Sequence, residues 1–115
     1  MTAQPPQLLP LGPRSPEQVA FDRQELGVIL SLYGRMVAGG EWRDYAITCL
    51  RDMAIFAVFR RTAETPLYRI EKHPRLRLRQ GMYVLVGPEG QVLRRGQDLA
   101  LVLRFLERRL FRTVD

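Results

Sequence analysis

Apolar residues recur every three or four positions in the segment that follows Asp22, and this spacing predicts an amphipathic helix. Asp22 followed by Glu25 is typical of an N-terminal capping box, with Phe21 and Leu26 in the positions of a hydrophobic staple. Gly39-Gly40 is expected to end the helix. The predicted apolar face comprises Leu26, Ile29, Leu30, Tyr33 and Val37.

Short apolar runs rich in β-branched and aromatic residues follow, and each predicts a strand. They cover residues 45–50, 54–61, 66–72, 82–86 and 91–95. Gly87-Pro88-Glu89-Gly90 is typical of a turn, with Pro88 at its second position. The segment Arg75–Arg79 alternates as well, and in an extended conformation it would project Arg75, Arg77 and Arg79 from one side.

A second helix is predicted after Gly96, with Gln97 or Asp98 as its cap. Its apolar stripe is Leu99, Val102, Leu103, Leu106 and Leu110. Because short connections join the strands and no strand–helix–strand unit occurs, the fold class is α+β. We expect an antiparallel meander of about five strands, flanked by an N-terminal and a C-terminal helix that cover one face of the sheet.

The first 16 residues contain five prolines and cannot form a regular helix or an interior strand. Residues 1–16 are therefore predicted to be a disordered tail, and residues 17–115 a single α+β domain. The three-residue spacing of Pro10, Pro13 and Pro16 also fits a polyproline II docking peptide, which leaves that alternative open. No run approaches the ~20 apolar residues that span a bilayer, so we expect no membrane contact.

The charge of the chain points to a binding function for an anion. The chain carries 18 basic and 12 acidic side chains and a net charge of +6. Lys72 is the one lysine, and the other 17 basic residues are arginines. Residues 60–115 hold 13 basic groups against 6 acids, so the whole excess lies in the second half. The candidate anion-binding residues are Arg60, Arg61, Arg75, Arg77, Arg79, Arg94, Arg95, Arg104 and Arg108.

Two functions fit such an arginine-rich surface. The leading hypothesis is a small non-enzymatic interaction module that binds an acidic protein partner. The alternative is binding of the RNA or DNA backbone, since arginine binds phosphate in a bidentate manner. Aromatic residues do not alternate with the arginines as a base-stacking platform requires, and this disfavours the alternative.

Reactive chemistry is sparse in the chain. One cysteine and one histidine exclude disulfides and the usual structural zinc sites, and the unpaired cysteine suits the cytoplasm. Cys49 with His73 is a candidate nucleophile–base pair, but Cys49 lies in an apolar strand where a buried thiol is expected. Glu41 and Asp44 flank Trp42, which we expect to pack over the end of the sheet. We predict no enzyme, cofactor or metal, although a pocket assembled from scattered residues would escape arguments from spacing.

The first helix carries a stripe of small residues, Gly27, Ser31, Gly34 and Ala38, at spacings of four, three and four. A glycine inside a helix costs roughly 1 kcal/mol relative to alanine, so close packing is expected to offset this cost. The packing element is either another part of the domain or a second copy in a homodimer.

Four stretches together resemble a domain-of-unknown-function family of short bacterial proteins: Phe21–Leu26, Leu32–Tyr45, Phe59–Arg61 and Pro66–Lys72. The resemblance extends from about Phe21 to Arg109. It implies one compact domain of bacterial cytoplasmic origin. The family carries no activity to transfer, so no residue takes a role from it.

Overall fold

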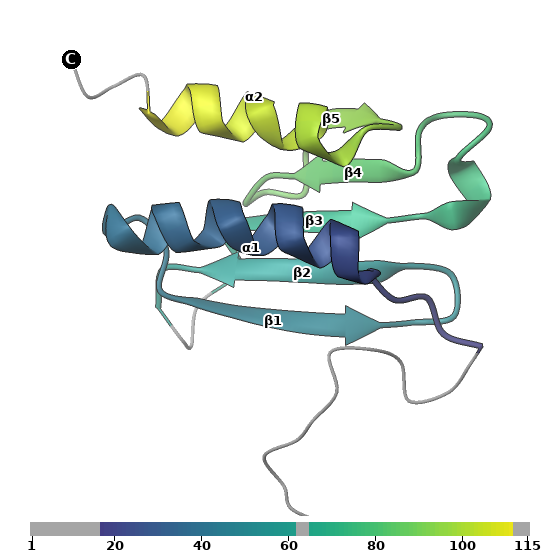
Figure 1. Cartoon of the computed structure of the whole chain (residues 1–115), viewed down its shortest axis with the longest axis horizontal. Coiled ribbons are helices and arrows are strands. Elements are labelled where there is room, and N and C mark those ends of the chain that lie inside the picture. Colours follow the sequence, from purple (N-terminus) through teal and green to yellow (C-terminus); the bar gives the residue numbers. More distant parts are fainter. Residues whose placement is uncertain (1–16, 62–64, 112–115) are drawn as a thin grey trace, which may run out of the picture.

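The computed structural model describes residues 17–61 and 65–111, with side chains as far as Arg108. It has the predicted α+β architecture of two helices and a five-stranded sheet (Figure 1). The elements are α1 (Arg23–Ala38), β1 (Asp44–Cys49), β2 (Ala54–Phe59), β3 (Tyr68–Lys72), the 3₁₀ turn η1 (Pro74–Leu76), β4 (Tyr83–Val86), β5 (Val92–Gly96) and α2 (Leu99–Phe111). The predicted tail at residues 1–16 lies outside the described residues.

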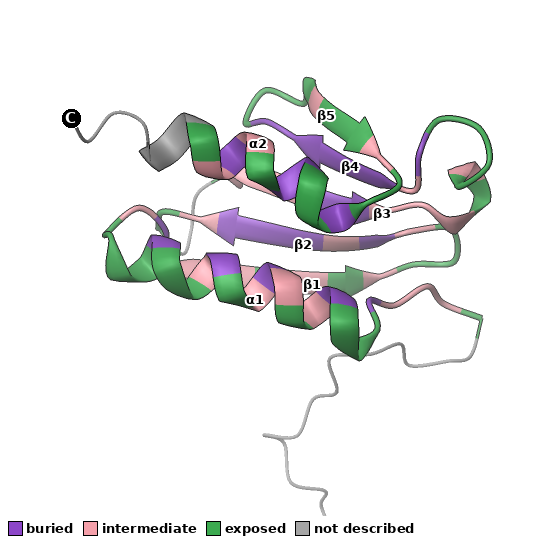
Figure 2. Ribbon diagram, turned by 45° about the horizontal axis from the view of Figure 1, so that its top comes forward, coloured by how far each residue is buried: buried purple, intermediate pink, exposed green. Residues whose placement is uncertain are grey.

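The sheet is an antiparallel meander in the order β1-β2-β3-β4-β5, which confirms the predicted topology. Both helices lie on the same face of the sheet, with α2 over β4 and β5 and α1 beside it over the other strands (Figure 1). Strands β2 and β4 are the most buried, whereas β5 is largely exposed at its edge (Figure 2).

The core lies between the two helices and the inner face of the sheet. α2 contributes the predicted stripe, with Leu99, Val102, Leu103 and Leu106 buried, whereas the side chain of Leu110 lies outside the described part. The buried face of α1 differs from the prediction, because the helix buries Leu32 and Met36 while Val37 is 40% exposed. The buried residues of α1 are Glu25, Ile29, Leu32 and Met36, while the predicted Leu26, Leu30 and Tyr33 are half-buried and pack against the same core. Ile29, Leu32 and Met36 are apolar at helical spacing, whereas the burial of the Glu25 carboxylate has no apolar signal.

Glu25 is 8% exposed and holds the first turn of α1 against the sheet. The predicted capping box is present, with Asp22 N donating to Glu25 Oε1 at 2.7 Å and Glu25 N donating to Asp22 Oδ1 at 2.8 Å. Lys72 Nζ on β3 donates to Glu25 Oε1 at 2.8 Å and to the Ala20 carbonyl at 2.8 Å. The Tyr83 hydroxyl on β4 donates to Glu25 Oε2. We call Glu25, Lys72 and Tyr83 the buried triad.

The buried triad is fully paired, because no buried side-chain polar atom in the described ranges lacks a hydrogen-bond partner. Burial, the hydrogen bond to Glu25 and the nearby carboxylates raise the pKa of the Tyr83 phenol above its usual range. Tyr83 therefore remains the proton donor to Glu25 at neutral pH. Three elements distant in sequence are joined at one carboxylate.

Aromatic rings fill the space under the second half of α1. Tyr45 and Phe56 stack with centroids 4.9 Å apart, and Tyr33 meets Tyr45 edge to face at 5.0 Å. Trp42 is 2% exposed and lies against Tyr33 and Tyr68, with centroids 6.1 and 6.3 Å away. This confirms that Trp42 packs over the end of the sheet.

Residues 75–79 do not adopt the extended conformation that would place Arg75, Arg77 and Arg79 on one side. Pro74–Leu76 is a 3₁₀ turn, and the Leu76 carbonyl accepts from the backbone N–H groups of Arg79, Gln80 and Gly81. Proline fixes its own φ, and the compact turn returns the chain so that β4 pairs antiparallel with β3. Arg75, Arg77 and Arg79 consequently do not project in a row from a strand.

Gly81 ends this turn in a conformation that requires glycine. Its φ is +102°, and a Cβ atom there would lie 2.9 Å from the backbone Cα and N atoms of Gly96 on β5. Gly34 is the opposite case, since nothing lies within 4 Å of a Cβ atom placed on this exposed helical residue.

We predict that alanine substitutions at these two glycines change stability in opposite directions. Gly81→Ala should lower the free energy of unfolding by at least about 1–2 kcal/mol, because it adds backbone strain and a clash with β5. Gly34→Ala should raise it by about 0.5–1 kcal/mol, because it restricts the unfolded chain and improves helix propensity. Urea denaturation of both variants tests this. Equal effects would contradict the described backbone.

We also predict that the buried triad dominates the ion-pair contribution to stability. Side-chain exposures are 14% for Lys72 and 9% for Glu25, so Lys72→Met leaves a buried carboxylate without its cation and should cost about 3–5 kcal/mol. Arg75→Met is the control, because Arg75 and Asp52 are 77% and 60% exposed at 3.3 Å, and its effect should stay below about 1 kcal/mol. Equal losses in urea denaturation would refute the assignment.

Candidate functional site

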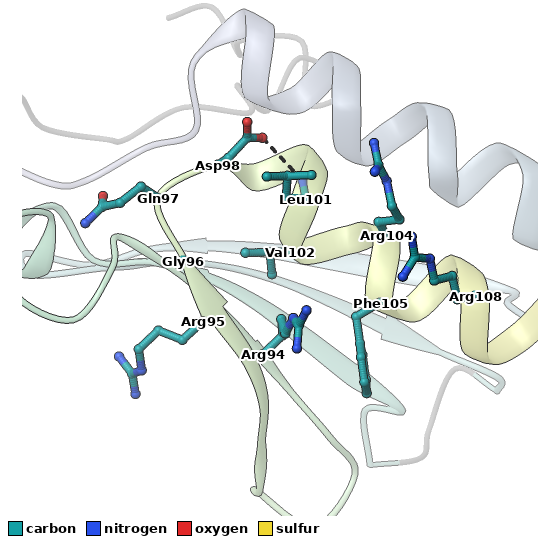
Figure 3. A pocket seen from close by; sticks show the side chains of 10 residues that line it. All are labelled: Arg94, Arg95, Gly96, Gln97, Asp98, Leu101, Val102, Arg104, Phe105 and Arg108. Atoms are coloured by element: carbon teal, nitrogen blue, oxygen red, sulfur yellow. Dashed lines mark hydrogen bonds between the residues drawn. The ribbon is translucent and has the colours of Figure 1, made fainter.

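A groove of about 540 Å³ lies between β5 and α2, and four arginines line it (Figure 3). We call it the β5–α2 groove. Its lining is contributed by the end of β5, the connection to α2 and one face of α2: Arg94, Arg95, Gly96, Gln97, Asp98, Leu101, Val102, Arg104, Phe105 and Arg108. Four of the nine arginines predicted to bind an anion are therefore neighbours in space.

A β-bulge in β5 turns Arg94 into the groove. Val92 lies opposite Val86, but Arg94 rather than Leu93 lies opposite Leu85, so β5 contains one extra residue. Leu85 is fully buried on the helix side of the sheet, which places Arg94 on that side as well. Without the extra residue, the alternation of a strand would point Arg94 to the other face.

The wall formed by α2 has helical periodicity of its own. Leu101, Arg104, Phe105 and Arg108 recur at intervals of three, one and three residues, a stripe distinct from the buried one. Phe105 lies beneath Arg94, whose Cζ atom is 5.7 Å from the centre of the ring. Leu101 is 51% exposed at the other end of this face. Sequence reasoning missed Phe105 and Leu101 as site residues, although their spacing from Arg104 and Arg108 was a usable signal.

Asp98 and Gln97, at the end of the groove, form hydrogen bonds within the domain. Asp98 caps α2, with its Oδ1 accepting from Leu101 N at 3.2 Å. The Gln97 side-chain amide donates to the carbonyl of Arg77 and so ties the start of α2 to the turn at residues 74–81. Asp98 is the one acidic residue among the ten that line the groove.

The groove arginines have no carboxylate within ion-pair distance in the described part of the chain. The ion pairs recorded there involve Arg35, Arg60, Arg69, Arg75, Lys72 and His73. Like charges brought together in this way repel, and an anion bound among them would relieve the repulsion. The electrostatics of the groove therefore favour a negatively charged occupant.

The other five predicted arginines lie elsewhere. Arg60 and Arg61 follow the end of β2, where Arg60 reaches Glu41 at 4.0 Å. Arg75 pairs with Asp52 at 3.3 Å, and Arg77 and Arg79 belong to the turn at residues 74–81. The predicted arginine set thus divides into one groove and two outlying groups.

Cys49 and His73 do not form a nucleophile–base pair. Cys49 lies opposite the buried Ala54 on the helix side of the sheet, and burial raises the pKa of its thiol, which disfavours the reactive thiolate. His73 Nε2 lies 2.9 Å from Glu71 Oε1 instead. In residues 17–61 and 65–111, no group of three or more His, Cys, Asp or Glu side chains is arranged to hold a metal ion.

The small-residue stripe of α1 faces outward. Gly27, Ser31, Gly34 and Ala38 are all exposed, and no atom lies within 4 Å of a Cβ atom built on Gly27 or Gly34. Gly27 and Ser31 nevertheless line a hollow that α1 shares with Ala100 and Leu103 of α2, so the stripe lies partly beside another element of the domain without close contact at its glycines. Self-association of two copies through the stripe stays a prediction.

Residues 19–103 match the sequence model of a family described as Protein of unknown function (DUF2794). The chain belongs to this family. The match covers all five strands, α1 and the start of α2, so it includes the β5 side of the groove. No curated protein and no solved structure gives a significant match to the chain. In the part of the chain that the structure describes, no helix is long and apolar enough to cross a membrane.

Proposed function

We propose that this DUF2794 protein is a small non-enzymatic interaction module that binds an acidic segment of a partner protein in the β5–α2 groove. The observation that carries the proposal is that Arg94, Arg104 and Arg108 line the helix side of one groove and Arg95 lies at its rim, with no carboxylate in ion-pair range among the described residues. Arginine presents a planar set of donors that matches a carboxylate in a bidentate geometry. Carboxylates from a partner would supply the missing negative charge.

The groove fits a protein segment better than a nucleic acid. Phe105 is the one aromatic residue in its lining, and Arg94 already lies over that ring. A single-stranded nucleic acid needs free aromatic faces for base stacking and a continuous basic track for its phosphates. The arginines outside the groove do not extend such a track, because Arg60 and Arg75 lie in separate groups beside acidic residues.

The remaining expectations form part of the same proposal. The unpaired thiol of Cys49 suits the reducing cytoplasm of a bacterial cell. An interaction module requires only a stable surface, and the paired buried triad beneath α1 supplies a rigid support for one. Self-association through α1 would place two grooves in one assembly and raise the avidity for a repeated acidic partner.

A charge-reversal pair tests the proposal. The probe is a fluorescein-labelled peptide of about ten residues rich in Asp and Glu, and binding is measured by fluorescence anisotropy at low salt. Arg104→Glu with Arg108→Glu should weaken binding at least about tenfold, because two attractive contacts become repulsive. The matched control is Arg43→Glu with Arg51→Glu, which changes the net charge equally at exposed positions outside the groove and should change affinity less than about threefold.

Two results would contradict this proposal. Equal losses in the groove pair and the control pair would mean that net charge, and not the groove, governs binding. Tighter binding of a labelled single-stranded RNA or DNA of matched charge, with affinity falling log-linearly with salt, would favour the nucleic-acid alternative.

A further inference from the structure

The β5–α2 groove runs along an unpaired edge of the sheet. β5 is the last strand in the order, and no described segment pairs with its outer side. An edge strand presents backbone N–H and C=O groups that a further strand can pair with. We infer that the acidic segment binds as an added sixth strand along β5, an inference that rests on the proposed function.

The shape of the groove matches this mode of binding. One wall is the strand itself, at Arg94, Arg95 and Gly96, and the other is the outer stripe of α2. A strand paired with β5 would lie about 4.8 Å beyond it, alongside that stripe. Its backbone would complete the hydrogen bonds of β5, and its helix-side residues would contact Leu101 and Phe105. Peptides bind other sheet edges in the same general way.

The side chains on both walls specify an acidic strand. Residues of an added strand alternate between the two faces of the sheet. The bulge places Arg94 on the helix side, together with Arg104 and Arg108 of α2. Arg95 lies opposite Val84, and thus on the other face. Carboxylates at adjacent positions of the added strand would therefore meet arginine on both faces, and an apolar residue on the helix side would cover Phe105.

Charge favours an acidic strand over a second copy of β5 as the segment that pairs with this edge. A second copy of β5 paired edge to edge would bring its own Arg94 and Arg95 against this pair, and like charges across a strand pair are destabilising. The opposite edge strand, β1, contains Asp44 as its one charged residue, and arginines flank it only beyond its two ends, at Arg43 and Arg51, so its charge suits an acidic strand less well. The arginines and the bulge that protect β5 from self-pairing thus also select its partner.

Backbone N-methylation of the peptide tests strand addition. A series of labelled acidic peptides carries one N-methyl group at each successive position, which removes one amide donor without changing any charge. Pairing with β5 uses the amides of alternate residues, so affinity should fall at least about tenfold at every second position in the bound stretch. The intervening positions should change less than about threefold, and they act as internal controls.

The outcomes separate the two proposals. If the parent peptide binds and Arg104→Glu with Arg108→Glu weakens it, but N-methylation has no two-residue period, groove binding stands and strand addition is overturned. If the parent peptide does not bind the wild-type chain at low salt, both proposals fall. A two-residue period that survives Arg104→Glu with Arg108→Glu at full affinity would mean that the peptide pairs with an edge other than β5.

Discussion

The architecture depends on how one buried carboxylate, Glu25, is neutralised. It accepts from the only lysine of the chain, from a tyrosine hydroxyl and from the backbone at its own helix cap, so it lies inside the domain without an unsatisfied charge. A buried carboxylate without partners would be strongly unfavourable, and these contacts together stabilise Glu25 in the interior. Because its partners come from β3 and β4, the start of α1 is fixed across the middle of the sheet.

The position of α1 leaves a defined place for α2. Both helices share one face of the sheet, and α2 packs over β4 and β5 beside α1 (Figure 1). Its buried stripe faces the core, and its next stripe faces beyond the open edge of β5. Gly96 helps this packing, since a Cβ atom there would already lie 3.4 Å from Val102 Cγ2. α2 does not extend past the edge of β5, and the groove lies between the outer stripe of α2 and that edge.

Local patterns predicted the elements well and the site in part. Capping residues, alternation and turn signals identify α1, the five strands and α2, because each is determined by neighbours in sequence. The burial of Glu25 on α1 escaped prediction because its partners, Lys72 and Tyr83, are distant in sequence. The single lysine among 17 arginines was the available signal that Lys72 has a special role. Its compact ammonium donates to both the Ala20 carbonyl and Glu25.

The arginine groove could be predicted only as a set of candidates. Arg104 and Arg108 follow from helical periodicity, but the direction of Arg94 depends on a bulge, and the bulge depends on how β5 registers with β4. Register is a property of the paired strands and leaves no local mark in Val92–Gly96. Arg75–Arg79 also alternates like a strand, but it follows Pro74, which begins a 3₁₀ turn, and folds as part of that turn.

Amide hydrogen exchange with and without an acidic peptide tests the central claim most directly, since it reports on the edge strand itself. With the peptide bound, exchange at β5 should slow at least about tenfold, and exchange at β1, the other edge, should stay unchanged. Protection that appears equally at β1 and β5, or that is absent from β5 while the peptide is bound, would contradict the account.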